Sequence, residues 1–128
     1  MAQSAGLHEP EDRLTPATID RHRALTSIQE ELEAVDWYAQ RVDATTDADL
    51  AAVLAQNRDE EKEHAAMTIE WLRRNDPALD RHLRTYLFTS GSIVGIETVA
   101  ESTDGEASEA TGPASGSLGI GSLKGAAR

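Results

Sequence analysis

At residues 42–50 the sequence reads VDATTDADL, and this short polar stretch separates two long segments with helical periodicity. Apolar residues recur every three or four positions on both sides of it, which is typical of a helix with one buried face. Asp47 can accept a hydrogen bond from an unpaired backbone N–H group and so begin the second helix. Because the connection is only about four residues long, the sequence predicts two antiparallel helices packed as a hairpin.

The two predicted helices have clear outer limits. Thr15 and Pro16 are a suitable N-cap and first helical residue, and Asn75-Asp76-Pro77 ends the second helix because proline cannot continue it. Each arm is about 26–28 residues long, or on the order of 40 Å. The apolar positions are Leu25, Ile28, Leu32, Val35, Ala39 and Val42 in the first helix, and Leu50, Val53, Leu54, Ala65, Thr68, Trp71 and Leu72 in the second.

Beyond the hairpin the composition changes twice. Residues 79–88 have helical spacing, which predicts a short third helix that docks before Gly91. Residues 97–117 are rich in Gly, Ser, Ala, Thr and acidic residues and contain no basic residue, which predicts a disordered linker. We therefore expect a flexible N-terminus at 1–14, a helical domain at 15–96, the linker at 97–117 and a separate C-terminal segment at 118–128.

The C-terminal segment contains three aliphatic residues after a long stretch without them. They are Leu118, Ile120 and Leu123, at spacings of two and three residues. One interpretation is a short linear motif that binds a groove on another protein. The other is a chain end without a role, and this feature alone does not decide between them.

The overall charge and composition exclude several classes of partner. The net charge is −11, from 23 acidic and 12 basic residues, which disfavours nucleic acids and anionic membrane surfaces and favours cations. There is no cysteine, so disulfides and thiolate metal sites are excluded, as expected for a cytoplasmic protein. Residues 1–14 contain no apolar run and predict neither a signal peptide nor a membrane anchor. The small helical part has little surface to bury, which favours self-association.

Two polar residues of the second helix lie where a packed helix face needs apolar side chains. Glu61 and His64 fall in the stripe that also contains Leu54, Thr68 and Trp71. Burying an unpaired carboxylate is unfavourable, whereas a bound divalent cation would turn this cost into an attraction. Residues three apart share a helix face, so both side chains can reach one ion. The same spacing also fits a solvated charged face, and that alternative remains open at this point.

Glu31 adds a second carboxylate from the first helix. Counting residues from the loop places it roughly level with the region just before Glu61, within about one helical turn. Di-iron sites of ferritin-like four-helix bundles use a Glu from each of two helices and a Glu-x-x-His from each of the other two. One chain supplies half of this set, Glu31, Glu61 and His64, so a two-fold symmetric dimer would complete it.

Other polar and aromatic residues have more than one interpretation. His22 and His82 have no carboxylate at ligand spacing and are interpreted as surface or interface residues. Tyr38 follows Glu31 by two turns, and it can either pack or donate a hydrogen bond to a ligand. Three residues on another side of the first helix form either a solvated acidic face or a patch that collects cations: Glu30, Glu33 and Trp37.

Several stretches of the sequence are similar to the encapsulated ferritin family. They are EELEAVDWY at 30–38, NRDEEKEHAAMT at 57–68 and EWLRRN at 70–75, and the resemblance extends over about residues 20–90. In addition, LGIGSLKG at 118–125 resembles the peptide that targets cargo proteins to encapsulin shells. The resemblance implies a half-ferritin domain at 15–96, which dimerises into a ferritin-like four-helix bundle and assembles into a ring, typically a decamer.

The resemblance also implies residue roles. Glu31, Glu61 and His64 match the iron ligands of the family, and Tyr38 matches a tyrosine near them, so these four are the expected catalytic residues. Glu30, Glu33 and Trp37 match the region where metal enters. Leu118, Ile120 and Leu123 match the aliphatic residues of the shell-targeting peptide.

The implied activity is that of a ferroxidase, which oxidises Fe(II) to Fe(III) with dioxygen at a di-iron centre shared between two subunits. Carboxylate and imidazole ligands suit iron, and anionic oxygens favour the ferric product. The implied location is an encapsulin nanocompartment in the cytoplasm, whose shell stores the iron mineral. Two alternatives use the same ligands: a non-enzymatic metal-binding dimer module, and a di-iron peroxide or dioxygen reductase.

Overall fold

The described part of the chain is entirely helical. The structure is a computed structural model that describes residues 6–110, with side chains through residue 103, and no strand occurs within that range. Its elements are a 3-10 helix, η2 (Glu11–Arg13), and four α-helices, α1 (Pro16–Ala44), α2 (Ala48–Arg74), α3 (Pro77–Tyr86) and α4 (Ile93–Ala110). This confirms the predicted all-α class. The turn of helix at η2 lies in the segment predicted to be flexible.

The capping residues of the hairpin are those that the sequence predicts. Oγ1 of Thr15 accepts a hydrogen bond from the backbone N–H of Thr18 at 3.1 Å, and Pro16 begins α1. The Asp47 carboxylate accepts one from the backbone N–H of Leu50 at 3.0 Å and begins α2. Because both caps satisfy N–H groups that the helix itself cannot pair, they fix where each helix starts.

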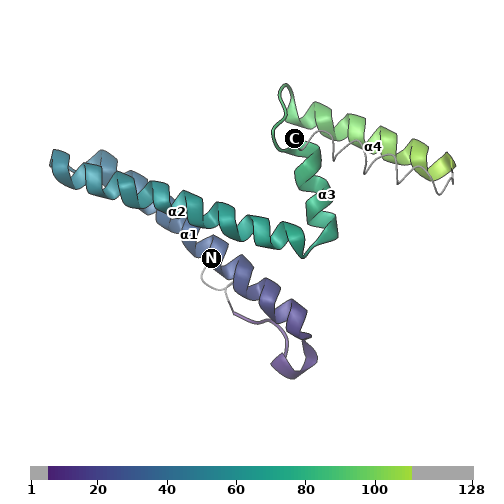
Figure 1. The fold of residues 1–128 in the computed structure, drawn as a ribbon, viewed down its shortest axis with the longest axis horizontal. Coiled ribbons are helices and arrows are strands. Elements are labelled where there is room, and N and C mark those ends of the chain that lie inside the picture. The colour runs from purple at the N-terminus through teal and green to yellow at the C-terminus, as the bar shows by residue number, and fades with distance from the viewer. Residues whose placement is uncertain (1–5, 111–128) are drawn as a thin grey trace. The chain divides into compact units, whose positions relative to one another are not determined.

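Helices α1 and α2 lie side by side along much of their length, as Figure 1 shows. Only Ala65 and Leu72 are fully buried among the described residues, at 3% and 4% exposure. Large apolar side chains of the same two helices remain about half exposed, among them Leu32 and Trp37. A pair of helices can bury only the stripe where they touch, so the hairpin by itself leaves part of its apolar surface in solvent.

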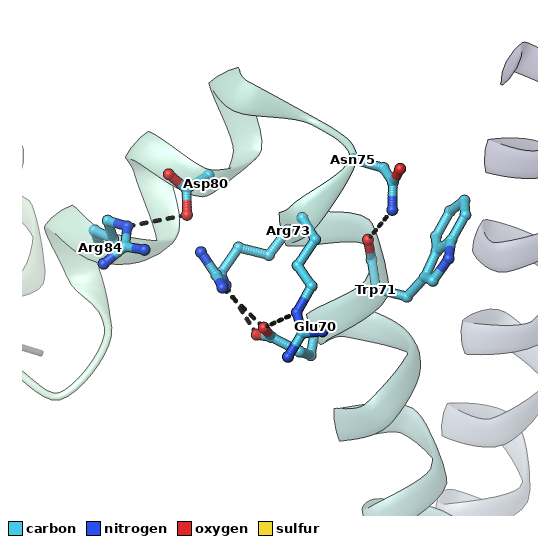
Figure 2. A network of polar contacts seen from close by, with 7 residues as sticks. Glu70, Trp71, Arg73, Asn75, Asp80 and Arg84 are labelled. Atoms are coloured by element: carbon cyan, nitrogen blue, oxygen red, sulfur yellow. Dashed lines mark hydrogen bonds and ion pairs between the residues drawn. The ribbon is translucent and has the colours of Figure 1, made fainter.

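The end of α2 is stabilised by a carboxylate held between two arginines. Glu70 accepts hydrogen bonds from Nε of Arg73 at 2.8 Å and from Nε of Arg74 at 2.7 Å. These bonds lower the pKa of Glu70 to about 2. In the same turn, the Asn75 side chain donates to the backbone carbonyl of Trp71 at 2.8 Å, as Figure 2 shows. Basic residues at a helix C-terminus also interact favourably with the helix dipole.

The chain divides at the predicted stop, with one unit ending at Asp76 and a second beginning at Pro77. The second unit contains α3 and α4, which pack against each other. Helix α3 ends at Tyr86, so the predicted third helix is shorter than its apolar pattern. Phe88 follows with a positive φ of 61° and a fully exposed side chain. Gly91, with φ 85°, then turns the chain toward α4.

The prediction of a disordered linker at 97–117 is wrong for residues 97–110, because α4 continues through Ala110. Ser92 caps this helix, its hydroxyl accepting a hydrogen bond from the backbone N–H of Gly95 at 3.0 Å. Alanine and glutamate are strong helix formers, and α4 contains no proline, which favours a helix over the disorder that its Gly, Ser and acidic residues suggest. The rest of the expected linker and the C-terminal segment lie outside the described residues. None of the helices within the described range is long and apolar enough to cross a membrane.

Candidate metal centre

Glu61 and His64 are in direct contact on one face of α2. Nδ1 of His64 lies 2.9 Å from Oε1 of Glu61, one helical turn away. The Glu61 side chain is 26% exposed and that of His64 is 52% exposed. The Glu-x-x-His spacing therefore places a carboxylate and an imidazole together on a surface that an ion can reach from solvent.

Glu31 reaches the same surface from α1. Its Oε1 atom accepts a hydrogen bond from Oγ1 of Thr68, at a distance of 3.4 Å. The Thr68 hydroxyl is also 3.1 Å from the backbone carbonyl oxygen of His64. One threonine therefore contacts both the carboxylate of α1 and the backbone of the histidine on α2.

The level of Glu31 along α2 differs from the one predicted by counting residues from the loop. Its contact is with Thr68, one turn beyond His64, whereas the count places it just before Glu61. Helical side chains lean toward the N-terminus of their own helix. Because the two helices are antiparallel, the Glu31 side chain leans toward the C-terminal end of α2, and the simple count omits this offset.

The surrounding carboxylates raise the pKa of His64 above its ordinary value of 6.5. The main cause is the hydrogen bond from His64 to Glu61, and the negative charges of Glu61, Glu31 and Glu63 act in the same direction. Partial desolvation opposes the effect. The contact with Glu61 therefore favours the protonated imidazole, and a cation would compete with that proton for the same two side chains.

The predicted ligands have the chemistry that iron needs, but a single chain has too few of them close together. Glu31, Glu61 and His64 provide carboxylate oxygens and an imidazole nitrogen, which suit iron and manganese. Within the described range, no group of three or more His, Asp or Glu side chains is placed so that it could hold a metal ion. One chain therefore provides only part of the predicted ligand set: Glu61 and His64 are in contact, and Glu31 reaches the same surface through its hydrogen bond with Thr68.

The family of the chain follows from its sequence. Residues 6–90 match the model of a family described as EncFtn-like, which is more than half of the chain. The chain belongs to the EncFtn-like family. This confirms the resemblance to encapsulated ferritins that the motifs at 30–38 and 57–68 indicate.

One relative of this EncFtn-like chain matches nearly its whole length, and others match part of it. An encapsulated ferritin-like protein of Rhodospirillum rubrum is 62% identical over 132 residues, which cover 99% of this chain and 94% of that protein. An encapsulin nanocompartment cargo protein of Myxococcus xanthus is 38% identical over 81 residues, or 59% of this chain and 62% of that one. A crystal structure of a protein from Nitrosomonas europaea, 59% identical, matches with a TM-score of 0.67 and covers 69% of this chain and 97% of its own.

The other residues predicted for the site of this EncFtn-like chain form no hydrogen bond or ion pair with Glu61 or His64 in its described part. The Tyr38 ring lies under the guanidinium of Arg41, 5.5 Å from the ring centroid, so its observed contact is a cation–π interaction. Glu30, Glu33 and Trp37 are exposed, and Trp37 is 52% exposed. Leu118, Ile120 and Leu123 lie outside the described residues.

Thr68 is the functional candidate that sequence reasoning missed in this EncFtn-like chain. The pattern assigns it to the apolar stripe of α2, between the buried Ala65 and Leu72. A hydroxyl in the middle of a buried stripe needs a hydrogen-bond acceptor. A threonine among the apolar residues of α2 therefore indicates from the sequence that such an acceptor is nearby. The identity of that acceptor, Glu31, depends on the helix register and could not be inferred from α2 alone.

Proposed function

We propose that two copies of this chain pair and form a ferroxidase centre, in which Glu31, Glu61 and His64 of both copies bind two Fe(II) ions. The observation that carries this proposal is the incomplete ligand set of one chain. Glu61 and His64 are in contact at 2.9 Å, and Glu31 is attached from the opposite helix at 3.4 Å through Thr68. Doubling this set by a two-fold axis gives the four glutamates and two histidines of a ferritin-like centre.

Exposed apolar side chains on the two helices that carry these ligands support pairing. Leu32, next to Glu31, is 51% exposed, and Met67, next to Thr68, is 64% exposed. Covering such side chains with a second copy is favourable by about 25 cal/mol per Å² of apolar surface. The same contact would exclude water from the ligands and strengthen their attraction for a cation. Assembly of these pairs into a ring, typically of ten chains, remains an expectation from the family.

The protein residues contribute charge and orientation to the reaction. The carboxylates of Glu31 and Glu61 stabilise the ferric product more than the ferrous substrate, because the product carries the higher charge. His64 must release its proton before its Nδ1 can act as a ligand. Each Fe(II) ion loses one electron, and dioxygen is the electron acceptor. Tyr38 would act near the ligands, and Glu30, Glu33 and Trp37 would collect ferrous ions.

We further propose that the product is stored inside an encapsulin shell. The names of the Rhodospirillum rubrum and Myxococcus xanthus relatives support encapsulation. The motif at 118–125, with Leu118, Ile120 and Leu123, would be the segment that binds the shell protein. On this proposal the chain works in the cytoplasm, within the nanocompartment, and passes Fe(III) to the mineral in the lumen.

Single alanine variants test the ferroxidase proposal. Replacing Glu31, Glu61 or His64 with alanine removes a symmetric pair of ligands from the centre. Because these ligands stabilise the transition state, each variant should oxidise Fe(II) at least about 100-fold more slowly than the wild type. Dioxygen consumption and ferric absorbance should be recorded together after mixing with Fe(II).

Glu60→Ala is the matched control, because Glu60 is an exposed carboxylate one residue before Glu61. It should oxidise Fe(II) at the wild-type rate. Wild-type rates in all three ligand variants would refute the proposal. Metal uptake without dioxygen consumption would instead support the non-enzymatic dimer module, and turnover only with an added reductant would support the reductase.

A further inference from the structure

Thr68 occupies a particular place between the two helices that carry the candidate ligands. It lies on α2 one turn after His64, half-buried, with the fully buried Ala65 and Leu72 on either side of it along the stripe. Its hydroxyl is 3.4 Å from Oε1 of Glu31, a residue 37 positions earlier in the sequence. This hydrogen bond therefore joins α1 to α2 beside the Glu61–His64 pair.

The hydroxyl has two acceptors and one proton. The backbone carbonyl oxygen of His64 is at 3.1 Å, and Oε1 of Glu31 is at 3.4 Å. A threonine hydroxyl donates only one hydrogen bond at a time, so the two acceptors share it. A carboxylate is the stronger acceptor of the two because it is charged. The Glu31 bond is the longer of the two, and the charge of its acceptor is what favours it.

Other threonines of the chain show what is specific to Thr68. Thr85 donates to the carbonyl oxygen of Arg81 at 3.0 Å, and Thr98 donates to that of Val94 at 3.3 Å. These are ordinary bonds from a helical hydroxyl to the carbonyl four residues earlier. Thr68 makes the same local bond and in addition contacts a carboxylate on another helix, which the local bond alone does not explain.

The contact restricts a flexible ligand. A glutamate side chain has several rotatable bonds, and ordering it is entropically unfavourable when it binds a metal. Because Oε1 of Glu31 is the acceptor of the Thr68 hydroxyl, Oε2 remains available for an ion. Hydrogen bonds of this kind orient ligand groups around metals, and their loss typically weakens metal binding about 10- to 100-fold.

We infer that Thr68 is a positioning residue, which holds the Glu31 carboxylate in register with Glu61 and His64 across the hairpin. The inference rests on the proposed function, since it assigns Thr68 a role toward the same metal site. It predicts that the hydroxyl of residue 68, and not its methyl group or its volume, determines how tightly the site binds a divalent metal.

Two pairs of variants isolate the hydroxyl. Thr68 and Thr68→Val differ in one donor group at almost equal volume, and Thr68→Ser and Thr68→Ala differ in the same group in a smaller side chain. Thr85→Val is the matched control, because it removes an equivalent helical hydroxyl that has only a backbone acceptor. Thermal unfolding of each metal-free variant shows whether the helices are intact.

The measurement is anaerobic titration of the full chain with Co(II), followed by the visible ligand-field spectrum and by calorimetry. Thr68→Val and Thr68→Ala should bind Co(II) about tenfold more weakly than the wild type, with altered band intensities, as expected for a lost ligand-orienting hydrogen bond. Thr68→Ser should restore most of the affinity, and Thr85→Val should bind as the wild type does.

The possible failures are distinguishable. If the wild type binds Co(II) no better than Glu61→Ala does, the proposed metal site is wrong and the role of Thr68 falls with it. If the wild type binds Co(II) and Thr68→Val binds it equally well with the same spectrum, only the inference about Thr68 is wrong. An affinity in Thr68→Ser as low as that in Thr68→Ala would also overturn it, because the hydroxyl would then not matter.

Discussion

At the scale of single residues, His64 is the group whose charge controls the candidate site. Its hydrogen bond with Glu61, aided by the negative charges of Glu61, Glu31 and Glu63, raises its pKa above 6.5. Because the pKa is raised in the folded chain, the stability from this contact is fully present below pH 6.5 and is lost as the pH rises through the raised pKa. Metal binding has the opposite dependence, because it requires the neutral imidazole.

We therefore predict that divalent metal affinity increases with pH across the raised pKa of His64. Below that pKa, each displaced proton should weaken binding by about tenfold per pH unit. Co(II) titrations at a series of pH values measure this slope. NMR titration of the His64 imidazole in metal-free protein should place its pKa above the ordinary value, and Glu61→Gln should lower it.

Glu60→Gln is the control for this titration, because Glu60 is not among the groups that shift the pKa of His64. It should leave the His64 titration unchanged. An imidazole in the wild-type protein that titrates at or below its ordinary pKa would contradict the account, as would a metal affinity that does not depend on pH.

The sequence predicts some of these residue contacts and not others. The Glu61–His64 contact follows from a spacing of three within one helix, because helix geometry alone places the two side chains together. The Glu31–Thr68 contact depends on the relative axial position of two helices, and residue counting misplaces it by about two turns. Contacts within an element are therefore predictable here, whereas contacts between elements require the structure.

At the scale of elements, local capping signals locate the helices and composition does not. Thr15 and Asp47 mark the starts of α1 and α2 as predicted, because their side chains pair with N–H groups that have no other partner. Ser92 gives the same signal for α4, but the acidic, Gly- and Ser-containing composition of 97–117 favoured disorder. A capping serine followed by apolar residues was thus the better guide.

The C-terminal segment 118–128 has a separate role in our proposal, and its removal should separate targeting from chemistry. Deleting residues 118–128 should abolish loading into shells when the chain is co-expressed with an encapsulin shell protein, because the aliphatic residues that would fill the binding groove are gone. Fe(II) oxidation by the purified truncated chain should remain at the wild-type rate. The amount of chain that copurifies with assembled shells is the measurement.

A variant with Leu118, Ile120 and Leu123 changed to alanine provides a control of unchanged length. It should load as poorly as the deletion if the aliphatic side chains carry the interaction. Shells that contain normal amounts of either variant would refute the assigned role of this segment.

At the scale of the whole molecule, a single chain has a small buried core and an incomplete ligand set, and a second copy would complete both. Ala65 and Leu72 are its only fully buried residues within the described range, and no complete metal site occurs there either. A second copy would cover exposed apolar side chains such as Leu32 and Met67 and would double the ligands. The sequence predicts the need for a partner from the short core and the half-set of ligands, but the face that pairs depends on packing between chains.

Native mass spectrometry during anaerobic titration with Fe(II) tests the shared centre most directly, because it counts chains and metal ions in the same particle. We predict that iron binds only to species that contain pairs of chains, and that binding saturates at two ions for every two chains. A single chain that binds iron as tightly as a pair does would contradict the account, as would pairs that form and remain free of iron.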